Sequence, residues 1–254
     1  MSLYILPALI GIVMGAGFVL MRTFPSSVVA AIPAVAIVLT FVLYGVSVRR
    51  SMSHVALFRL IFPGVFLVIG SGLFSTILNR QSIYVVFSVL ASVLTMWFVS
   101  IAIQYVRRLE RYQPPALEML SAALNILSVF FVVSWLFAFI VFFGPAVWKI
   151  LLPGALVFAL FFFHSLGSSG ADHEERLLVS GVATLLASEA LGVFSFLPFG
   201  YFTLAVVLMI AVLFLYGMAW AHLERRATRR ALKMYGGIAL AGMVLTLITT
   251  RWTP

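Results

Sequence analysis

The residue with the clearest potential for chemistry is Glu189, a carboxylic acid inside a long apolar run. No Lys or Arg lies within one helical turn of it. An acidic side chain midway through a membrane span costs roughly 2.5–3.5 kcal/mol on insertion scales, so a compensating contact is expected. Apolar surroundings favour the neutral form of a carboxyl group. We therefore predict that Glu189 is either a buried proton-coupling group or a protonated acid that makes one hydrogen bond to another helix.

A polar stripe in the apolar run 116–142 is a second candidate site. Its members recur at steps of three and four residues: Glu118, Ser121, Asn125 and Ser128. This spacing places them on one face of a helix. In lipid such a face turns toward other helices, where each polar contact contributes about 0.6 kcal/mol on average. The stripe predicts either plain helix–helix packing or, together with Ser188 and Glu189, the wall of a substrate path.

The histidines and carboxylates form no recognisable metal site. The four histidines are His54, His164, His173 and His222. They show no HExxH or HxxxH spacing, and the chain has no cysteine, which excludes thiolate metal sites and disulfides. An acidic cluster at Asp172, Glu174 and Glu175 precedes an apolar run, where a helix dipole favours anions. We therefore predict no metal and no other cofactor, and no residue is assigned a catalytic role.

The composition requires lipid as the solvent for the elements that carry these residues. Hydrophobic residues make up 64% of the chain and charged residues 9%, with a mean hydropathy of +1.19. Soluble domains carry about 25% charged residues because water must solvate their surface. Long continuous apolar runs, rather than short alternating segments, predict helices rather than a barrel. The fold class is therefore all-α, a polytopic transmembrane helix bundle.

About nine spans of roughly 20 residues fit the chain if the loops are short. The predicted spans are 3–22, 27–48, 55–78, 82–106, 116–142, 146–166, 177–198, 200–222 and 232–250. The connectors are too short for a soluble domain, so residues 1–254 are predicted to form a single transmembrane domain. The last span is the weakest, because it begins beside Lys233 and contains Gly236-Gly237.

The distribution of basic residues predicts the orientation in the cell membrane. With the N-terminus in the cytoplasm, eleven Lys and Arg residues fall in cytoplasmic loops and four fall outside. This excess follows the positive-inside rule and places the C-terminus outside. The net charge of +9 therefore reflects topology, and we predict no nucleic-acid partner. The most basic connector holds Arg225, Arg226, Arg229 and Arg230, which are predicted to contact lipid head groups or an acidic protein.

A parallel internal repeat is also predicted. At an offset of 117 residues the identities include Arg59 with Arg176, Gly64 with Gly181, and Tyr84 with Tyr201. At an offset of 120 residues they include Pro25 with Pro145, and Pro33 with Pro153. The predicted halves are 1–112 and 116–230, followed by a final helix over 231–250. Because four spans repeat, both halves keep the same orientation, an arrangement used by transporters.

Small residues on several spans predict close packing of helices. Gly11 and Gly15 form a GxxxG pattern in the first span. Such patterns let two helix backbones approach closely, although GxxxG alone is a weak signal. We interpret this pattern as structural.

Three classes of function remain open from the sequence. The first is a small transporter or permease in which Glu189 is a buried acidic coupling group. The second is a non-catalytic membrane subunit or scaffold of a larger envelope complex, with protein partners inside the bilayer. The third is an intramembrane lipid-modifying enzyme that would use the histidines and acids. The geometry of the site must decide between them, because a fold does not fix a function.

Overall fold

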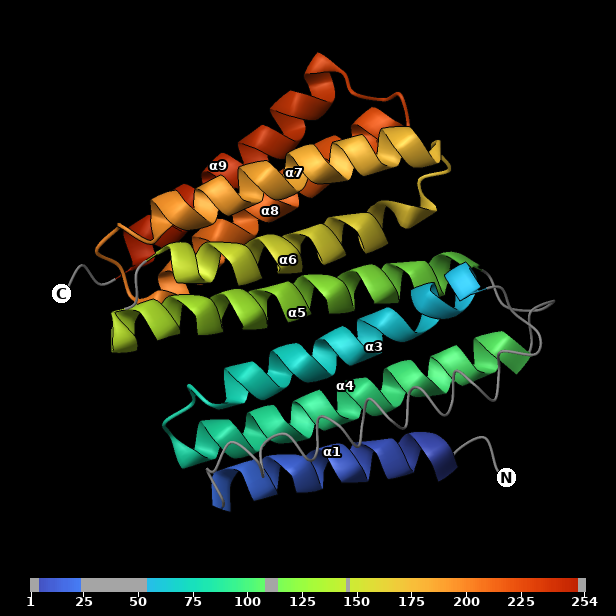
Figure 1. The fold of residues 1–254 in the computed structure, drawn as a ribbon, viewed down its shortest axis with the longest axis vertical. Coiled ribbons are helices and arrows are strands. Elements are labelled where there is room, and N and C mark those ends of the chain that lie inside the picture. The colour runs from blue at the N-terminus through green and yellow to red at the C-terminus, as the bar shows by residue number, and fades with distance from the viewer. Residues whose placement is uncertain (1–4, 24–53, 108–113, 145–146, 251–254) are drawn as a thin grey trace. The chain divides into compact units, whose positions relative to one another are not determined.

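The computed structural model describes residues 5–23, 54–107, 114–144 and 147–250, and these residues form helices and turns without a strand. The α-helices are α1 (Ile5–Thr23), α3 (His54–Ser75), α4 (Gln81–Arg107), α5 (Pro114–Phe143), α6 (Trp148–Ser165), α7 (His173–Phe194), α8 (Tyr201–Leu223) and α9 (Arg229–Thr249) (Figure 1). A 3-10 turn, η2 (Leu166–Ser168), follows α6. The predicted span 27–48 lies outside the described residues.

Most of these helices have the length and composition of membrane spans. Six are long and apolar enough to cross a bilayer: α4, α5, α6, α7, α8 and α9. α1 and α3 contain shorter apolar stretches, Pro7–Thr23 and Leu60–Ser75. The class predicted from composition, a multi-pass α-helical membrane protein, is thus confirmed.

The helix ends follow local chemistry more closely than hydropathy does. α5 begins at Pro114, where a proline costs nothing because the first turn has no partner for its missing N–H. The prediction that a span begins at 177 was too late, because α7 starts at His173. Asp172 occupies its N-cap position, and Glu174 and Glu175 lie in its first turn, where the helix dipole favours anions.

The chain divides into two compact units, Met1–Ser128 and Val129–Pro254, with the boundary inside α5. In the first unit α4 packs against both α1 and α3. α1 and α4 run antiparallel, since Phe18 contacts Phe87 while Gly11 lies opposite Met96. α1 and α3 run in the same direction, because Met21 near the end of α1 reaches Ser75 at the end of α3.

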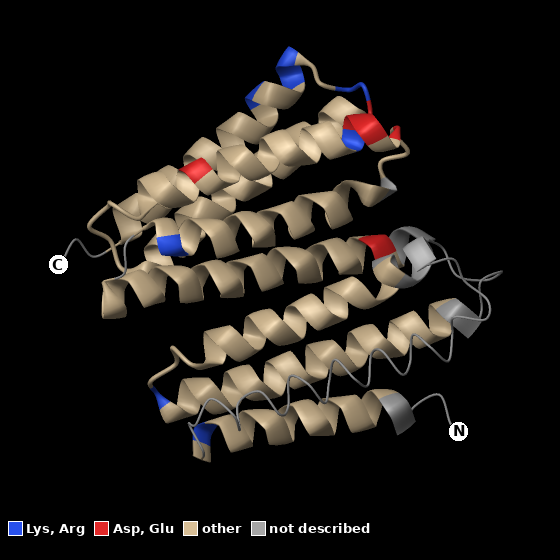
Figure 2. Cartoon of the chain, viewed as in Figure 1, with Lys and Arg blue, Asp and Glu red and all other residues tan. Residues whose placement is uncertain are grey.

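In the second unit each helix from α6 to α9 packs against the next one along the chain. The contact between α6 and α7 is tight: a Cβ atom added at Gly154 would lie only 2.3 Å from Cδ2 of Leu191, which is fully buried. Most of the charged residues lie at or near the ends of the helices (Figure 2). Most lie where α7 begins, α8 ends and α9 begins, and His222 and Glu175 approach each other there.

Candidate ligand-binding groove

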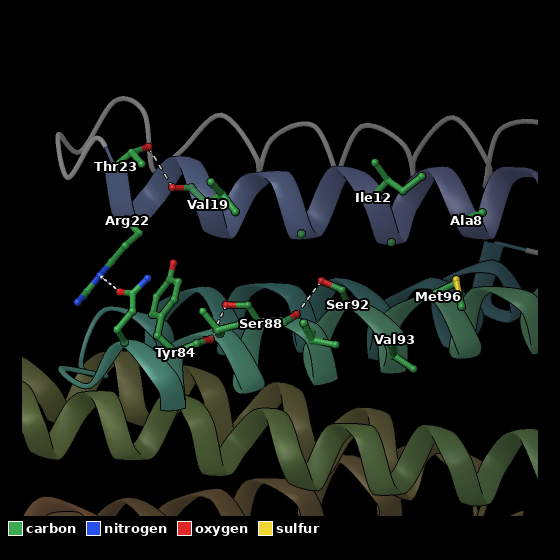
Figure 3. Close-up of a pocket in the computed structure, with 15 residues that line it drawn as sticks. Ala8, Ile12, Val19, Arg22, Thr23, Tyr84, Ser88, Ser92, Val93 and Met96 are labelled. Carbon is green, nitrogen blue, oxygen red and sulfur yellow. Dashed lines mark hydrogen bonds between the residues drawn. The ribbon is translucent and has the colours of Figure 1, made fainter.

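A groove of about 570 Å³ lies between α1 and α4 in the first unit (Figure 3). It is open along one side and runs from Ala8 to Thr23 on α1 and from Gln81 to Met96 on α4. At 1.5 Å per residue its length is roughly 22 Å. Its volume falls within the range of about 300–1,000 Å³ that is typical of ligand pockets.

The space in the groove comes from small residues, chiefly Gly15 of α1 and Ser92 of α4. Gly11 and Gly15 of α1 lie opposite Met96 and Ser92 of α4. The Ser92 hydroxyl donates to the backbone carbonyl of Ser88 at 2.8 Å, within its own helix. Ser88 likewise donates to a carbonyl of its own helix. These hydroxyl groups are therefore satisfied by the helix, and the space between the helices is lined mainly by apolar atoms.

One end of the groove is polar and positively charged. The Arg22 Nε donates to Oε1 of Gln81 at 3.2 Å, and its two terminal nitrogens donate to the carbonyl oxygens of Leu78 and Asn79 at 3.5 and 3.3 Å. These bonds tie Arg22 to the turn between α3 and α4 and hold the guanidinium group beside the groove. Arginine has five N–H donors in a planar fork that suits phosphate and carboxylate groups. Only part of that capacity is used here, and the side chain is exposed.

Tyr84 secures this end of the groove. Its ring lies 5.3 Å from the Arg22 guanidinium carbon, a favourable cation–π geometry. Its hydroxyl group donates to the backbone carbonyl of Phe18 at 2.5 Å, which links α4 to α1. The two helices are thus joined at the end where the cation lies, and the groove opens between them beyond this point.

The described lining of the groove is chemically simple. It includes no carboxylate, histidine or lysine, and Arg22 is its one charged residue. An apolar channel that ends at a fixed cation matches an amphiphile with an anionic head group. The sequence analysis did not indicate this site, because Arg22 is simply one of the four basic residues that it assigns to the outer side of the membrane. The pairing of Gly11-xxx-Gly15 with Ser88-xxx-Ser92 at the same spacing was the available signal.

Glu189 is exposed within this chain, so the described residues do not bury it, and its coupling role stays a prediction. α7 buries Ser180, Ala183 and Ala187 against its neighbours, and Glu189 points to the opposite side of the helix. It also lies only five residues before the helix ends at Phe194, so it is not at the middle of the span. Ser188 is partly exposed, and its hydroxyl donates to the carbonyl of Thr184 in the same helix.

The polar stripe of α5 is largely internal. Ser121, Asn125 and Ser128 are buried, as a face turned toward protein requires, whereas Glu118 is exposed. The Ser128 hydroxyl donates to a carbonyl of its own helix. None of these residues lines the groove between α1 and α4.

The basic connector between α8 and α9 is exposed at Arg225, Arg226, Arg229 and Arg230. Arg226 pairs with Glu224 at 3.3 Å. Such an exposed ion pair contributes little to stability. The connector is therefore accessible to lipid head groups or to another protein.

The histidines and carboxylates of the described part of the chain form no group of three or more that could hold a metal ion. His222 Nε2 lies 3.9 Å from the Glu175 carboxylate, which is beyond hydrogen-bond reach. His173 instead contacts the Arg176 guanidinium at 2.9 Å. Arg176 also donates to the carbonyl of Gly167, so this contact ties the turn before α7 together.

The helices define a multi-pass membrane protein with an apolar groove between α1 and α4. The chain belongs to the family described as "Protein of unknown function (DUF5656)", which matches residues 45–249. The match begins after α1 and includes α3 to α9. No curated protein and no solved structure matches the chain.

Proposed function

We propose that this protein is a non-catalytic membrane protein that binds a phospholipid in the groove between α1 and α4. The observation that carries the proposal is the apolar groove with Arg22 at one end. One leaflet of a bilayer has a hydrocarbon thickness of about 15 Å. A groove of roughly 22 Å therefore has room for an acyl chain and the start of its head group. The phosphate would lie at Arg22, beside Gln81.

Photolabelling tests this proposal. Purified protein is placed in phosphatidylglycerol vesicles that contain a small fraction of lipid with a diazirine on its acyl chain, and labelled peptides are mapped after illumination. We expect labelling of α1 and α4 around Ile12 and Val89. Gly15→Leu should block it severalfold by filling the groove. Gly237→Leu is the matched control, because Gly237 is an exposed helical glycine with open space around it in α9.

Head-group recognition is tested separately with Arg22→Gln. This variant removes the charge but keeps an amide that can hydrogen-bond the carbonyls of Leu78 and Asn79. We expect weaker labelling by phosphatidylglycerol. Unchanged labelling in both Gly15→Leu and Arg22→Gln would overturn the proposal. A disulfide between cysteines introduced at Val89 and within 27–48 would also overturn it, because the chain itself would then occupy the groove.

The proposed topology has nine spans, with the N-terminus in the cytoplasm and the C-terminus outside. Because α1 and α3 run in the same direction, a crossing between them is needed, and the apolar run 27–48 supplies it in this proposal. In the second unit the described cations gather where α8 ends and α9 begins, whereas Lys149 lies at the start of α6. The positive-inside rule then places the connector in the cytoplasm.

The topology can be tested directly because the natural chain has no cysteine. Single cysteines replace Arg226 and Lys149, and intact cells are treated with a membrane-impermeant maleimide. We expect labelling at 149 only. The same connector is proposed to attract anionic lipid, at about 1 kcal/mol for each cation near the surface.

A transport role for Glu189 has weaker geometric support. Its carboxyl group lies on the exposed side of α7 and faces no space enclosed by the second unit. Uptake into proteoliposomes with and without a pH gradient tests this role. Equal gradient-driven uptake by the natural protein and Glu189→Gln would exclude coupling through this residue.

A further inference from the structure

The two sides of α7 differ sharply in composition and exposure. The side packed against α6 and α8 carries the buried residues Ser180, Ala183, Ala187 and Leu191. The opposite side presents an exposed ridge at steps of four residues: Leu177, Gly181, Leu185, Glu189 and Val193. Ridges of this spacing are the surfaces that helices use to interdigitate. This exposed ridge is roughly 24 Å long.

Glu189 makes exposure of the ridge to lipid energetically unfavourable, because its carboxyl group is polar. It lies five residues before the end of α7, about 7.5 Å below it along the axis. Side chains of a helix tilt toward its N-terminus, so the carboxyl group of Glu189 is directed away from the nearer helix end. In the described part of the chain no hydrogen bond or ion pair reaches it. A polar group at this depth needs a partner, and the described residues supply none.

Gly181 is a second, independent indication that another helix packs against the same ridge. A Cβ atom added there would meet nothing within 4 Å among the described residues, so none of their contacts requires a glycine. A glycine inside a helix costs roughly 0.5–1 kcal/mol relative to alanine. In membrane helices, exposed small residues permit close approach of another helix. The glycine is thus explained if another backbone packs against this ridge.

We propose that the α7 ridge is the interface with a second copy of this chain, related by a two-fold axis along the membrane normal. Such an axis brings identical residues to the same depth, so the two Glu189 side chains meet. Protonated carboxyl groups are self-complementary, because each donates one O–H and accepts another. The described cations of the chain lie near helix ends rather than on this ridge, so a carboxyl–carboxyl pair is the partner that the chain can supply at this depth.

Association is measured in vesicles by single-molecule photobleaching of labelled protein over a range of protein-to-lipid ratios. An interhelical polar contact contributes about 0.6 kcal/mol, and at most about 1.7, which corresponds to a roughly 3- to 20-fold change in affinity. We expect Glu189→Leu to weaken dimerisation by that factor. Glu189→Gln should retain most of the affinity, because an amide also donates and accepts.

Gly181→Leu tests the close approach. It should weaken dimerisation at least as much as Glu189→Leu, whereas Gly237→Leu on α9 should not. Both glycines are exposed and both have open space around them, so the two changes are matched. The ridge faces outward, so neither variant should alter the thermal stability of the monomer.

Cysteine crosslinking locates the interface, since the chain has no natural cysteine. We expect Leu185→Cys, on the ridge, to form a disulfide-linked dimer in vesicles. Leu240→Cys, equally exposed on α9, should not. A monomeric protein at all ratios would overturn the proposal. So would a dimer that Gly181→Leu and Glu189→Leu leave unchanged, or one that crosslinks at 240 and not at 185.

Discussion

The helix pairs α1–α4 and α6–α7 both contain glycines at their contact. In α6–α7 the partner side chain fills the space beside the glycine, whereas in α1–α4 a groove remains between the helices. In α6–α7 the notch at Gly154 is filled by Leu191, which is fully buried. In α1–α4 the notch at Gly15 faces Ser92, whose oxygen would lie 3.6 Å from an added Cβ atom. The leucine opposite Gly154 therefore makes a tight contact, whereas the serine opposite Gly15 leaves space between the helices.

The difference shows what drives packing when lipid is the solvent. Lipid tails are as apolar as leucine, so burying apolar surface gives little net gain between membrane helices. Complementary shape and interhelical hydrogen bonds decide the contact instead. The α6–α7 pair relies on shape, while α1–α4 relies on the bond from Tyr84 to Phe18 and on the contacts of Arg22. Four substitutions test whether shape holds α6 to α7 and whether hydrogen bonds hold α1 to α4.

Gly154→Leu should have the largest effect. The new side chain would overlap Leu191, which is fully buried, and overpacking of this kind costs about 1–3 kcal/mol. We expect a clear loss of stability in detergent, measured by thermal unfolding followed by circular dichroism. A variant as stable as the natural protein would mean that the α6–α7 joint can relax.

Tyr84→Phe should have the next largest effect. It removes the interhelical hydrogen bond to the Phe18 carbonyl while leaving the ring in place. The expected loss is about 0.6 kcal/mol, and at most about 1.7. Unfolding by sodium dodecyl sulfate measures it, with Tyr105→Phe in the same helix as the control. Equal stability of the two variants would show that this bond does not hold α1 to α4.

Gly15→Ala should stabilise the protein slightly. An added methyl group meets Ser92 at an ordinary contact distance, and alanine is favoured over glycine inside a helix by roughly 0.5–1 kcal/mol. The same unfolding assay should show a gain of about 0.5 kcal/mol. Destabilisation would indicate that the groove at this point is narrower than described.

Gly11→Ala should have the smallest effect. Its added Cβ would lie 3.3 Å from Cβ of Met96, a contact that requires the helices to separate by a few tenths of an ångström. This strain offsets the helix preference of alanine, so we expect a net change within about 0.5 kcal/mol of zero. The stability of Gly11→Ala should therefore fall below that of Gly15→Ala.

The helix positions could be predicted because long apolar runs separated by charged connectors leave few alternatives. The predicted run 200–222, for example, corresponds to α8 at Tyr201–Leu223. The acidic cluster before α7 was assigned to the helix dipole, and Glu174 and Glu175 do lie in the first turn. The nine spans and the repeat stay predictions, partly because 27–48 lies outside the described residues.

The orientation of each helix about its own axis could not be predicted. In water an apolar stripe marks the inside, but in lipid both sides of a span are apolar. The flanks of Glu189 therefore gave no indication that it faces outward. The α1–α4 groove was missed for a related reason, because it depends on which small residues of two distant segments meet. Only the pairing of Gly15 with Ser92 across the helices defines it.

The hydrogen bond between Arg22 and Gln81 has a consequence for the order in which the helices can assemble during biosynthesis. The two residues are 59 positions apart, and at about 5–20 residues per second the ribosome needs roughly 3 to 12 s to make that stretch. During this interval α1 has left the ribosome but its partner helix does not yet exist. α1 must therefore remain in the membrane without its contact to α4 until the fourth predicted span has been synthesised. Only then can Arg22 form its hydrogen bond to Gln81.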